Sequence, residues 1–288
     1  SLVEWSREHH ADKTADESKI PEIMSFVRWA AAEAAYPPGV APLVEALLDG
    51  VRDALGDNFT GLYLCGSLAL GGFGPETSDA DMLVVTERPV SDAEFTALKA
   101  LHERLPPEGN DFSLDYDIYY IDRETIRRFA EGQRHVKVGA GEPFHRGEHR
   151  PNWVLERWTV RERGVVVSGP DPKTLIEPIS ADDLRAAAGE ELQRRLAHWR
   201  DGSWPREELA VVGAQAFEVE TVCRALFTME AGAVSTKREA VDWAIAALPE
   251  RWQMLIEWGR GCGRGPARDE TKVPEVLEFL TWAAGKTG

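Results

Sequence analysis

The apolar positions near the start of the chain recur at helical spacing. They do so first over Ile23–Ala31 and again, after Pro37-Pro38-Gly39, over Leu43–Val51. This pattern predicts one helix that ends before the prolines. It predicts a second helix from about 41 to 55, which Gly56 ends.

Shorter apolar runs then predict strands. The predicted strands cover residues 60–65, 81–86 and 113–121, and a helix over 91–104, with Ser91 as its N-cap, lies between the last two. Residues 132–151 are rich in Gly, His, Arg and Glu without a clear period, which predicts a loop. Helix is expected again from about Trp153.

Beyond Gly169-Pro170-Asp171-Pro172 the pattern is helical only. The predicted elements are a helix capped by Ser180 that runs to about Trp199, a long helix over 206–231 that ends at Gly232, a helix with Thr236 and Glu239 as its capping box, and helices that start near Pro249 and Pro274. The sequence therefore predicts an α+β chain: a small mixed sheet with flanking helices in residues 1–170, then an all-helical bundle in residues 171–288.

Charge and cysteine content narrow the class of protein. The 288 residues carry a formal net charge of −16, which disfavours nucleic-acid binding and favours encounter with a cationic small molecule, although acidity also serves solubility alone. The three cysteines are scattered and their number is odd, as in a reducing compartment. The polar N-terminal stretch and the lack of an apolar run of about 18 residues predict a cytoplasmic protein that does not enter a membrane.

The stretch from Leu62 to Val85 carries the most chemical information. An apolar strand runs into Gly66-Ser67, a glycine-rich loop follows, and the next strand opens with Asp79-Ala80-Asp81. Side chains alternate along a strand, so the two aspartates share a face and lie roughly 7 Å apart along the backbone. Paired carboxylates suit Mg²⁺, and the Gly-Ser turn suits phosphate oxygens, which together indicate nucleotidyl transfer.

The combination of Gly66-Ser67 with Ser78-Asp79-Ala80-Asp81 resembles the signature of the nucleotidyltransferase superfamily, which has the polymerase-beta-like fold. Further segments resemble the bacterial aminoglycoside adenylyltransferases that act on streptomycin and spectinomycin: Gly141–Phe144, Arg161–Pro170 and Ser235–Ala244. The resemblance implies AMP transfer from ATP, with Mg²⁺ held by Asp79 and Asp81. It also implies that Gly66, Ser67 and Ser78 lie at the nucleotide.

A third carboxylate is expected on the neighbouring strand as general base or further metal ligand. Asp115 and Asp117 share a face by alternation, so the strand pattern does not decide which of the two is this carboxylate. The family places a glutamate at the position that matches Asp117, which favours Asp117. Aspartate there is shorter by about one methylene, which matters because a base must reach the hydroxyl that it deprotonates.

The family also brings an arginine and a lysine from its helical domain to the ATP phosphates. Arg224, in Cys223-Arg224-Ala225, and Lys237, in Ser235-Thr236-Lys237, match these two positions. Both types suit a triphosphate, and a lysine in the first turn of a helix opposes the helix dipole, which favours a ligand role.

An acceptor pocket is expected around the loop 141–153. Its candidate residues are Glu142, His145, His149 and Trp153, with Glu218 on the long helix as an acidic substitute for family positions that have no match here. The expected acceptor is a cationic small molecule, and the expected oligomeric state is a monomer. The alternatives are a nucleotidyltransferase of the same fold with another acceptor, and a protein that binds nucleotide with little transferase activity.

Overall fold

The computed structural model describes residues 36, 39–74, 78–105, 115–139, 142–263 and 265–287. The chain separates into two compact units, residues 1–42 and 43–288. Helix α3 (Val40–Leu55) begins in the first unit, and all later elements belong to the second. The predicted helix over Ile23–Ala31 lies outside the described residues.

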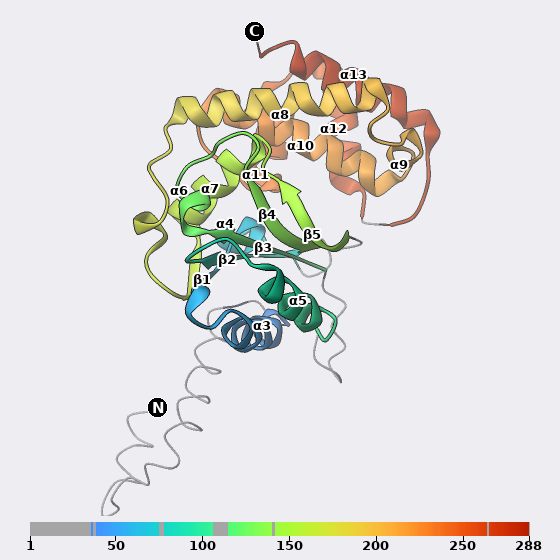
Figure 1. Cartoon of the computed structure of the whole chain (residues 1–288). Helices are drawn as coiled ribbons and strands as arrows, with labels where there is room; N and C mark the ends of the chain where they lie inside the picture. Colours follow the sequence, from blue (N-terminus) through green and yellow to red (C-terminus); the bar gives the residue numbers. More distant parts are fainter. Residues whose placement is uncertain are drawn as a thin grey trace, which may run out of the picture. The chain divides into compact units, whose positions relative to one another are not determined.

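A six-stranded mixed sheet forms the first part of the larger unit, in the order β5-β4-β3-β2-β1-β6 (Figure 1). Its strands are β1 (Phe59–Leu64), β2 (Ala80–Thr86), β3 (Tyr116–Asp122), β4 (Arg134–Gly139), β5 (Glu142–Glu148) and β6 (Val165–Ser168). β2 and β3 pair in parallel, whereas the other neighbours are antiparallel. The predicted strands at 60–65 and 81–86 are confirmed. The third, predicted from residue 113, begins at Tyr116: Asp115 is described and precedes the strand, and 113 and 114 lie outside the described residues.

The two faces of the sheet are covered by different helices, namely α3 and α5 (Asp92–His102) on one face and α6 (Arg123–Arg127) and α7 (Asn152–Arg163) on the other (Figure 1). His102 of α5 hydrogen-bonds to the Tyr120 hydroxyl at 2.7 Å on the first face. On the second face, Trp153 and Val160 of α7 pack in one apolar cluster with Leu83 of β2. The side chains on both faces of β2 are therefore mostly buried.

The loop predicted over 132–151 is wrong, because β4 and β5 form a hairpin there. β5 is the outermost strand of the sheet and none of its residues is buried. Charged and polar side chains are common on such edge strands, where they discourage pairing with other chains. Because of this composition, the sequence of β5 does not show the alternation of apolar and polar residues that predicts a strand. β6 likewise has no counterpart among the predicted strands.

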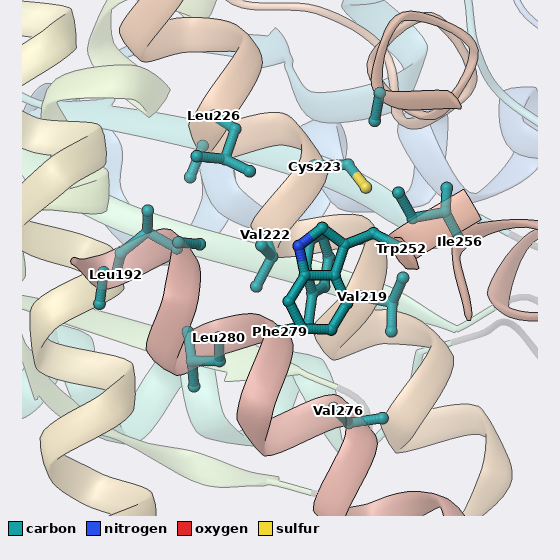
Figure 2. Packing of buried hydrophobic residues seen from close by; sticks show 14 of the residues in the cluster. Leu192, Val219, Val222, Cys223, Leu226, Trp252, Ile256, Val276, Phe279 and Leu280 are labelled. Atoms are coloured by element: carbon teal, nitrogen blue, oxygen red, sulfur yellow. The ribbon is translucent and has the colours of Figure 1, made fainter. Parts of the chain in front are cut away.

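The second part of the larger unit is helical. Its elements are α8 (Ala181–Asp201), α9 (Arg206–Leu209), α10 (Val212–Ala231), α11 (Lys237–Ala247), α12 (Gln253–Gly261) and α13 (Val273–Ala284), with short 3₁₀ turns η3 (Pro172–Thr174), η4 (Glu250–Trp252) and η5 (Glu270–Lys272). α10 packs against α8, α11, α12 and α13. Figure 2 shows its Val219, Val222 and Leu226 against Trp252 and Phe279 in this core. The domain boundary near residue 170 stays a prediction.

The single helix predicted over 206–231 is wrong, since the chain leaves helical geometry between α9 and α10. Val211 forms an isolated β-bridge with Arg268, and the Asp269 N–H donates to the Ala210 carbonyl at 2.8 Å. This pairing with a segment almost 60 positions away outcompetes local helix propensity, which is a weak preference.

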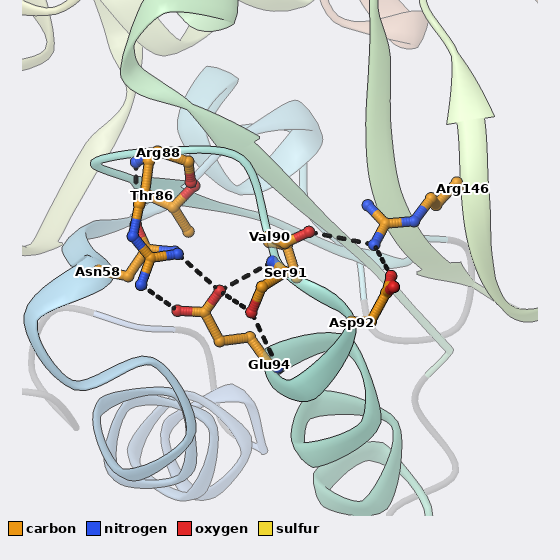
Figure 3. Close-up of polar contacts among 8 residues, drawn as sticks. All are labelled: Asn58, Thr86, Arg88, Val90, Ser91, Asp92, Glu94 and Arg146. Atoms are coloured by element: carbon orange, nitrogen blue, oxygen red, sulfur yellow. Dashed lines mark hydrogen bonds and ion pairs between the residues drawn. The ribbon is translucent and has the colours of Figure 1, made fainter.

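Capping boxes begin three of the helices. Ser91, Ser180 and Thr236 each accept from the backbone N–H three residues on, as the sequence predicts for Ser91, Ser180 and the Thr236–Glu239 pair. Ser91 belongs to a larger polar cluster at the end of β2 (Figure 3). Arg88 donates to both carboxylate oxygens of Glu94 at 3.0 Å, and the Ser91 N–H donates to Glu94 at 2.8 Å.

This cluster fixes where α5 begins relative to β2. Thr86, the last residue of β2, donates to the Arg88 carbonyl, and the Arg88 N–H donates to the Asn58 side chain at 2.9 Å. Burial by itself would raise the pKa of Glu94, but the hydrogen bonds from Arg88 and Ser91 outweigh it and lower that pKa to about 2.

Glu94→Ala is expected to lower the free energy of unfolding by about 1–2 kcal/mol at pH 7, because it removes the capping box and the partner of Arg88. A lowered folded-state pKa contributes stability above the unfolded value of 4.5, and this contribution is lost as the pH falls toward about 2. Urea unfolding at pH 7 and pH 3 measures both effects, with exposed Glu103→Ala as control. A difference between wild type and Glu94→Ala that does not shrink at pH 3 would contradict this explanation.

Candidate active site

The parallel pairing of β2 with β3 brings two carboxylates together. Asp81 lies in register with Asp117, and side chains at paired positions point to the same face of a sheet. Asp79 precedes β2 by one residue and shares that face by alternation. Asp115 precedes β3, is exposed, and its carbonyl accepts from the Ala80 N–H at 2.9 Å.

Glycines at two positions let backbone approach these carboxylates. Gly66 has φ +53°, and a Cβ there would lie 1.8 Å from Oδ2 of Asp81. A Cβ on Gly139 of β4 would lie 1.8 Å from Oδ1 of Asp117. Any larger residue at either position would displace a carboxylate, so both glycines are required by close packing at the site.

A further carboxylate, which the sequence analysis did not identify, faces this pair. Glu156 of α7 lines a small cavity of about 40 Å³ together with Asp81, Tyr119 and Trp153. No motif marks Glu156 in the sequence. The only sequence signal is its place one helical turn after Trp153, on the same face of the helix.

The carboxylates leave the site with excess negative charge. Burial, and after it the charges of Glu156, Asp117 and Asp79, raise the pKa of Asp81 to about 8, while Arg224 opposes them. Burial also raises the pKa of Glu156, again against the influence of Arg224. Arg224 of α10 is therefore the cation that the helical part of the chain brings to this face of the sheet.

The described residues between β1 and β2 include the short helix α4 (Gly66–Leu70), which ends in a turn at Gly71 with φ +76°. Further on, Gly74 and Ser78 hydrogen-bond to each other: the Gly74 N–H donates to Oγ of Ser78 at 3.1 Å, and the Ser78 N–H donates to the Gly74 carbonyl at 2.8 Å. Oγ of Ser67 is buried and has no hydrogen-bond partner among the described residues. A buried hydroxyl of this kind is available for a ligand.

Lys237 starts α11 beside the turn at Gly71. A Cβ on Gly72 would lie 2.9 Å from Thr236, the N-cap of that helix, so the glycine turn and the start of α11 are in direct contact. Nζ of Lys237 lies 3.3 Å from Glu220 of α10. The structure thus places both predicted cations, Arg224 and Lys237, next to elements that carry the predicted nucleotide residues.

The predicted acceptor residues do not form one group. Glu142 and His145 lie on the edge strand β5, where Glu142 pairs with Lys137 and Nδ1 of His145 donates to the Pro143 carbonyl at 2.7 Å. Trp153 is buried and stacks on His149, with ring centroids 4.6 Å apart. Of the residues named for the acceptor, Trp153 lines the cavity beside Asp81.

Glu218 occupies a different environment from the one expected for a substrate ligand. Its side chain is 1% exposed and pairs with Arg195 of α8, with Nε at 2.9 Å from Oε1. This pair lies inside the helical part of the chain and stabilises it. A role for Glu218 in acceptor binding therefore finds no support in its surroundings.

A divalent cation fits the site if a nucleotide completes its ligands. Among the residues that the structure describes, no three His, Cys, Asp or Glu side chains form a metal cage. Mg²⁺ in proteins is commonly held by one or two carboxylates plus substrate phosphates, and Asp79 with Asp81, at the start of β2, supplies two carboxylates. The raised pKa of Asp81 marks negative charge that a cation would balance.

Comparison with known proteins agrees with this geometry. Residues 45–157 match the nucleotidyltransferase domain, and residues 174–283 match the C-terminal domain of aminoglycoside adenylyltransferase. The chain is therefore an enzyme of the nucleotidyltransferase class. Over most of its length it is similar to the aminoglycoside adenylyltransferases.

Individual relatives are distant but similar over most of their length. A spectinomycin 9-adenylyltransferase of Staphylococcus aureus is 24% identical over 247 residues, which cover 80% of this chain and 89% of the relative. An aminoglycoside (3'')(9) adenylyltransferase of Escherichia coli is 24% identical over 78% of this chain and 86% of its own length. The crystal structure of a spectinomycin adenyltransferase from Enterococcus faecialis with ATP and spectinomycin shares the fold, with a TM-score of 0.67 at 16% identity over 85% of this chain and 98% of that one. In the described parts of the present chain, no helix has the length and apolarity to span a membrane.

Asp81→Asn is expected to stabilise the metal-free protein by about 1–2 kcal/mol at pH 8–9. A raised folded-state pKa means that ionisation of Asp81 costs stability, and this cost grows as the pH rises from about 4 to about 8. Thermal unfolding in the presence of a chelator measures the difference. Exposed Asp115→Asn makes the same charge change and serves as control. A destabilised Asp81→Asn protein at pH 8–9 would contradict the crowding of carboxylates described above.

Proposed function

We propose that the protein transfers AMP from ATP to a hydroxyl of an aminoglycoside or aminocyclitol antibiotic of the streptomycin–spectinomycin type and releases pyrophosphate. The observation that carries the proposal is the Asp81–Asp117 pair on adjacent strands, with Arg224 opposite and the start of α11 against the glycine turn. The names of the relatives support adenylyl transfer and this class of acceptor.

In this reaction an acceptor hydroxyl oxygen bonds to the α-phosphorus while the bond to the pyrophosphate oxygen breaks. Asp117 takes the proton of the hydroxyl. Its place in register with Asp81 favours it over the exposed Asp115 as the base. Asp79 and Asp81 hold Mg²⁺, which would neutralise phosphate charge and stabilise the attacking and leaving oxygens.

The remaining residues bind and orient the nucleotide. The free hydroxyl of Ser67 and the backbone at Gly66 would contact phosphate, while Ser78 hydrogen-bonds to Gly74. Arg224 and Lys237 supply positive charge to a triphosphate that would otherwise meet only carboxylates. The net charge of −16 suits a cationic acceptor. A monomeric and cytoplasmic state stays a prediction of the sequence, as do the two domains 1–170 and 171–288.

Pyrophosphate release from Mg²⁺-ATP, measured with streptomycin, spectinomycin and kanamycin, tests the proposal. We expect release with streptomycin or spectinomycin. Asp117→Asn, which keeps size but removes the base, is expected to lower kcat by about 100-fold or more.

Three results would contradict the proposal in different ways. Release only with another acceptor would keep the reaction and change the substrate. ATP binding without release for any acceptor would favour a protein that holds nucleotide with little transferase activity. Undiminished turnover in Asp117→Asn would remove Asp117 as the base.

A further inference from the structure

One face of α10 carries an arrangement that the proposed reaction does not yet use. Phe217, Glu220 and Arg224 are spaced at i, i+3 and i+7, so they lie along the same side of the helix. Arg224 acts on Asp81 and Glu156 at the active site. The other two residues of this face contact the side chain of Lys237.

The contacts to Lys237 are specific. Its Nζ lies 3.3 Å from Oε2 of Glu220 and 5.3 Å from the centroid of the Phe217 ring. Among the residues that the structure describes, Phe217 is one of three large apolar side chains that remain exposed, at 47%. A carboxylate on one side and an aromatic face on another restrict where the ammonium group can lie.

The side chain of Lys237 needs such restraint because its place at the start of a helix is electrostatically unfavourable for a cation. It is the first residue of α11, where the positive end of the helix dipole repels a cation. Its side chain has four rotatable methylenes and loses substantial rotamer entropy when it is fixed on a ligand. Its side chain is still 37% exposed while paired, so an ammonium with three donors keeps some of them for a phosphate.

We propose that Glu220 is a positioning residue for nucleotide binding: together with the ring of Phe217 it holds the ammonium group of Lys237 ready for the triphosphate of ATP. The inference rests on the proposed function, since it takes Lys237 as a phosphate ligand. Glu220 does not touch the nucleotide and acts only through Lys237.

The helical part of the chain offers a matched control. Lys272 pairs with Glu275 of α13 at 2.8 Å and lies 5.5 Å from the centroid of the Trp258 ring. This is the same combination of lysine, glutamate and aromatic ring, in residues that the proposed site does not include. Glu275→Gln makes the same chemical change as Glu220→Gln.

ATP affinity, measured by calorimetry for wild type, Glu220→Gln, Lys237→Met and the double variant, tests the proposal. We expect Glu220→Gln to weaken ATP binding about three- to tenfold, because Lys237 must then be ordered by the nucleotide alone. The double variant should bind ATP as Lys237→Met does. Phe217→Leu should weaken binding in the same direction, whereas Glu275→Gln should leave it unchanged.

The direction of the change in ATP affinity distinguishes a positioning role of Glu220 from a purely electrostatic effect of its charge. Removal of a carboxylate near a triphosphate would by charge alone tighten ATP binding, so unchanged or tighter binding in Glu220→Gln overturns the proposal. An equal effect with and without Lys237 also overturns it, because Glu220 would then not act through that side chain. Melting temperatures of all variants identify any loss of folded protein.

If the protein transfers AMP, steady-state kinetics of the same variants provide a second test. A positioning role raises the KM for ATP and leaves kcat nearly unchanged. ATP binding without transfer to any tested acceptor would contradict the proposed function, while the calorimetric comparison would still decide the role of Glu220. No ATP binding by wild type would overturn both.

Discussion

The parallel pairing of β2 and β3 is the constraint on which the site depends. It sets Asp81 beside Asp117, and the side chains on the reverse face of both strands are buried against helices. A shift of one residue in this register would send either carboxylate into the opposite core and bring apolar side chains to the site. The hydrophobic pattern that folds the sheet therefore also fixes the position of Asp81 relative to Asp117.

Excess negative charge is the second property of the site. Burial raises the pKa of Asp81, three neighbouring carboxylates raise it as well, and the opposing Arg224 comes from the helical part of the chain. Sheet and helices thus supply charges of opposite sign to one place. Such a site gains most from a ligand that contains both a cation and phosphate groups.

Sequence reasoning succeeded where local pattern and fold agree. The strand that carries Asp81, the capped helices and the helical second part follow from alternation, capping residues and helical spacing. It failed where distant contacts decide the structure. The edge hairpin β4–β5 carries charged residues throughout, and the break before α10 depends on pairing with Arg268.

The residues of the candidate site also fall into two groups, those that the sequence reveals and those that only the structure reveals. The Gly66-Ser67 and Asp-x-Asp motif is visible in the sequence, because its residues are close together along the chain. Glu156 is not, since a glutamate on an amphipathic helix has no feature that separates it from a solvated one. Glu218 shows the converse case: a promising acidic residue is buried with Arg195, and only tertiary structure could reveal that partner.

Binding of Mn²⁺, measured by electron paramagnetic resonance with and without a non-hydrolysable ATP analogue, tests the central claim most directly. If Asp79 and Asp81 share the cation with phosphate oxygens, Mn²⁺ binds weakly to the protein alone and much more tightly with the nucleotide. This gain should be lost in a variant with both aspartates changed to asparagine. Mn²⁺ binding that does not respond to the nucleotide, or that survives this double substitution, would contradict the account.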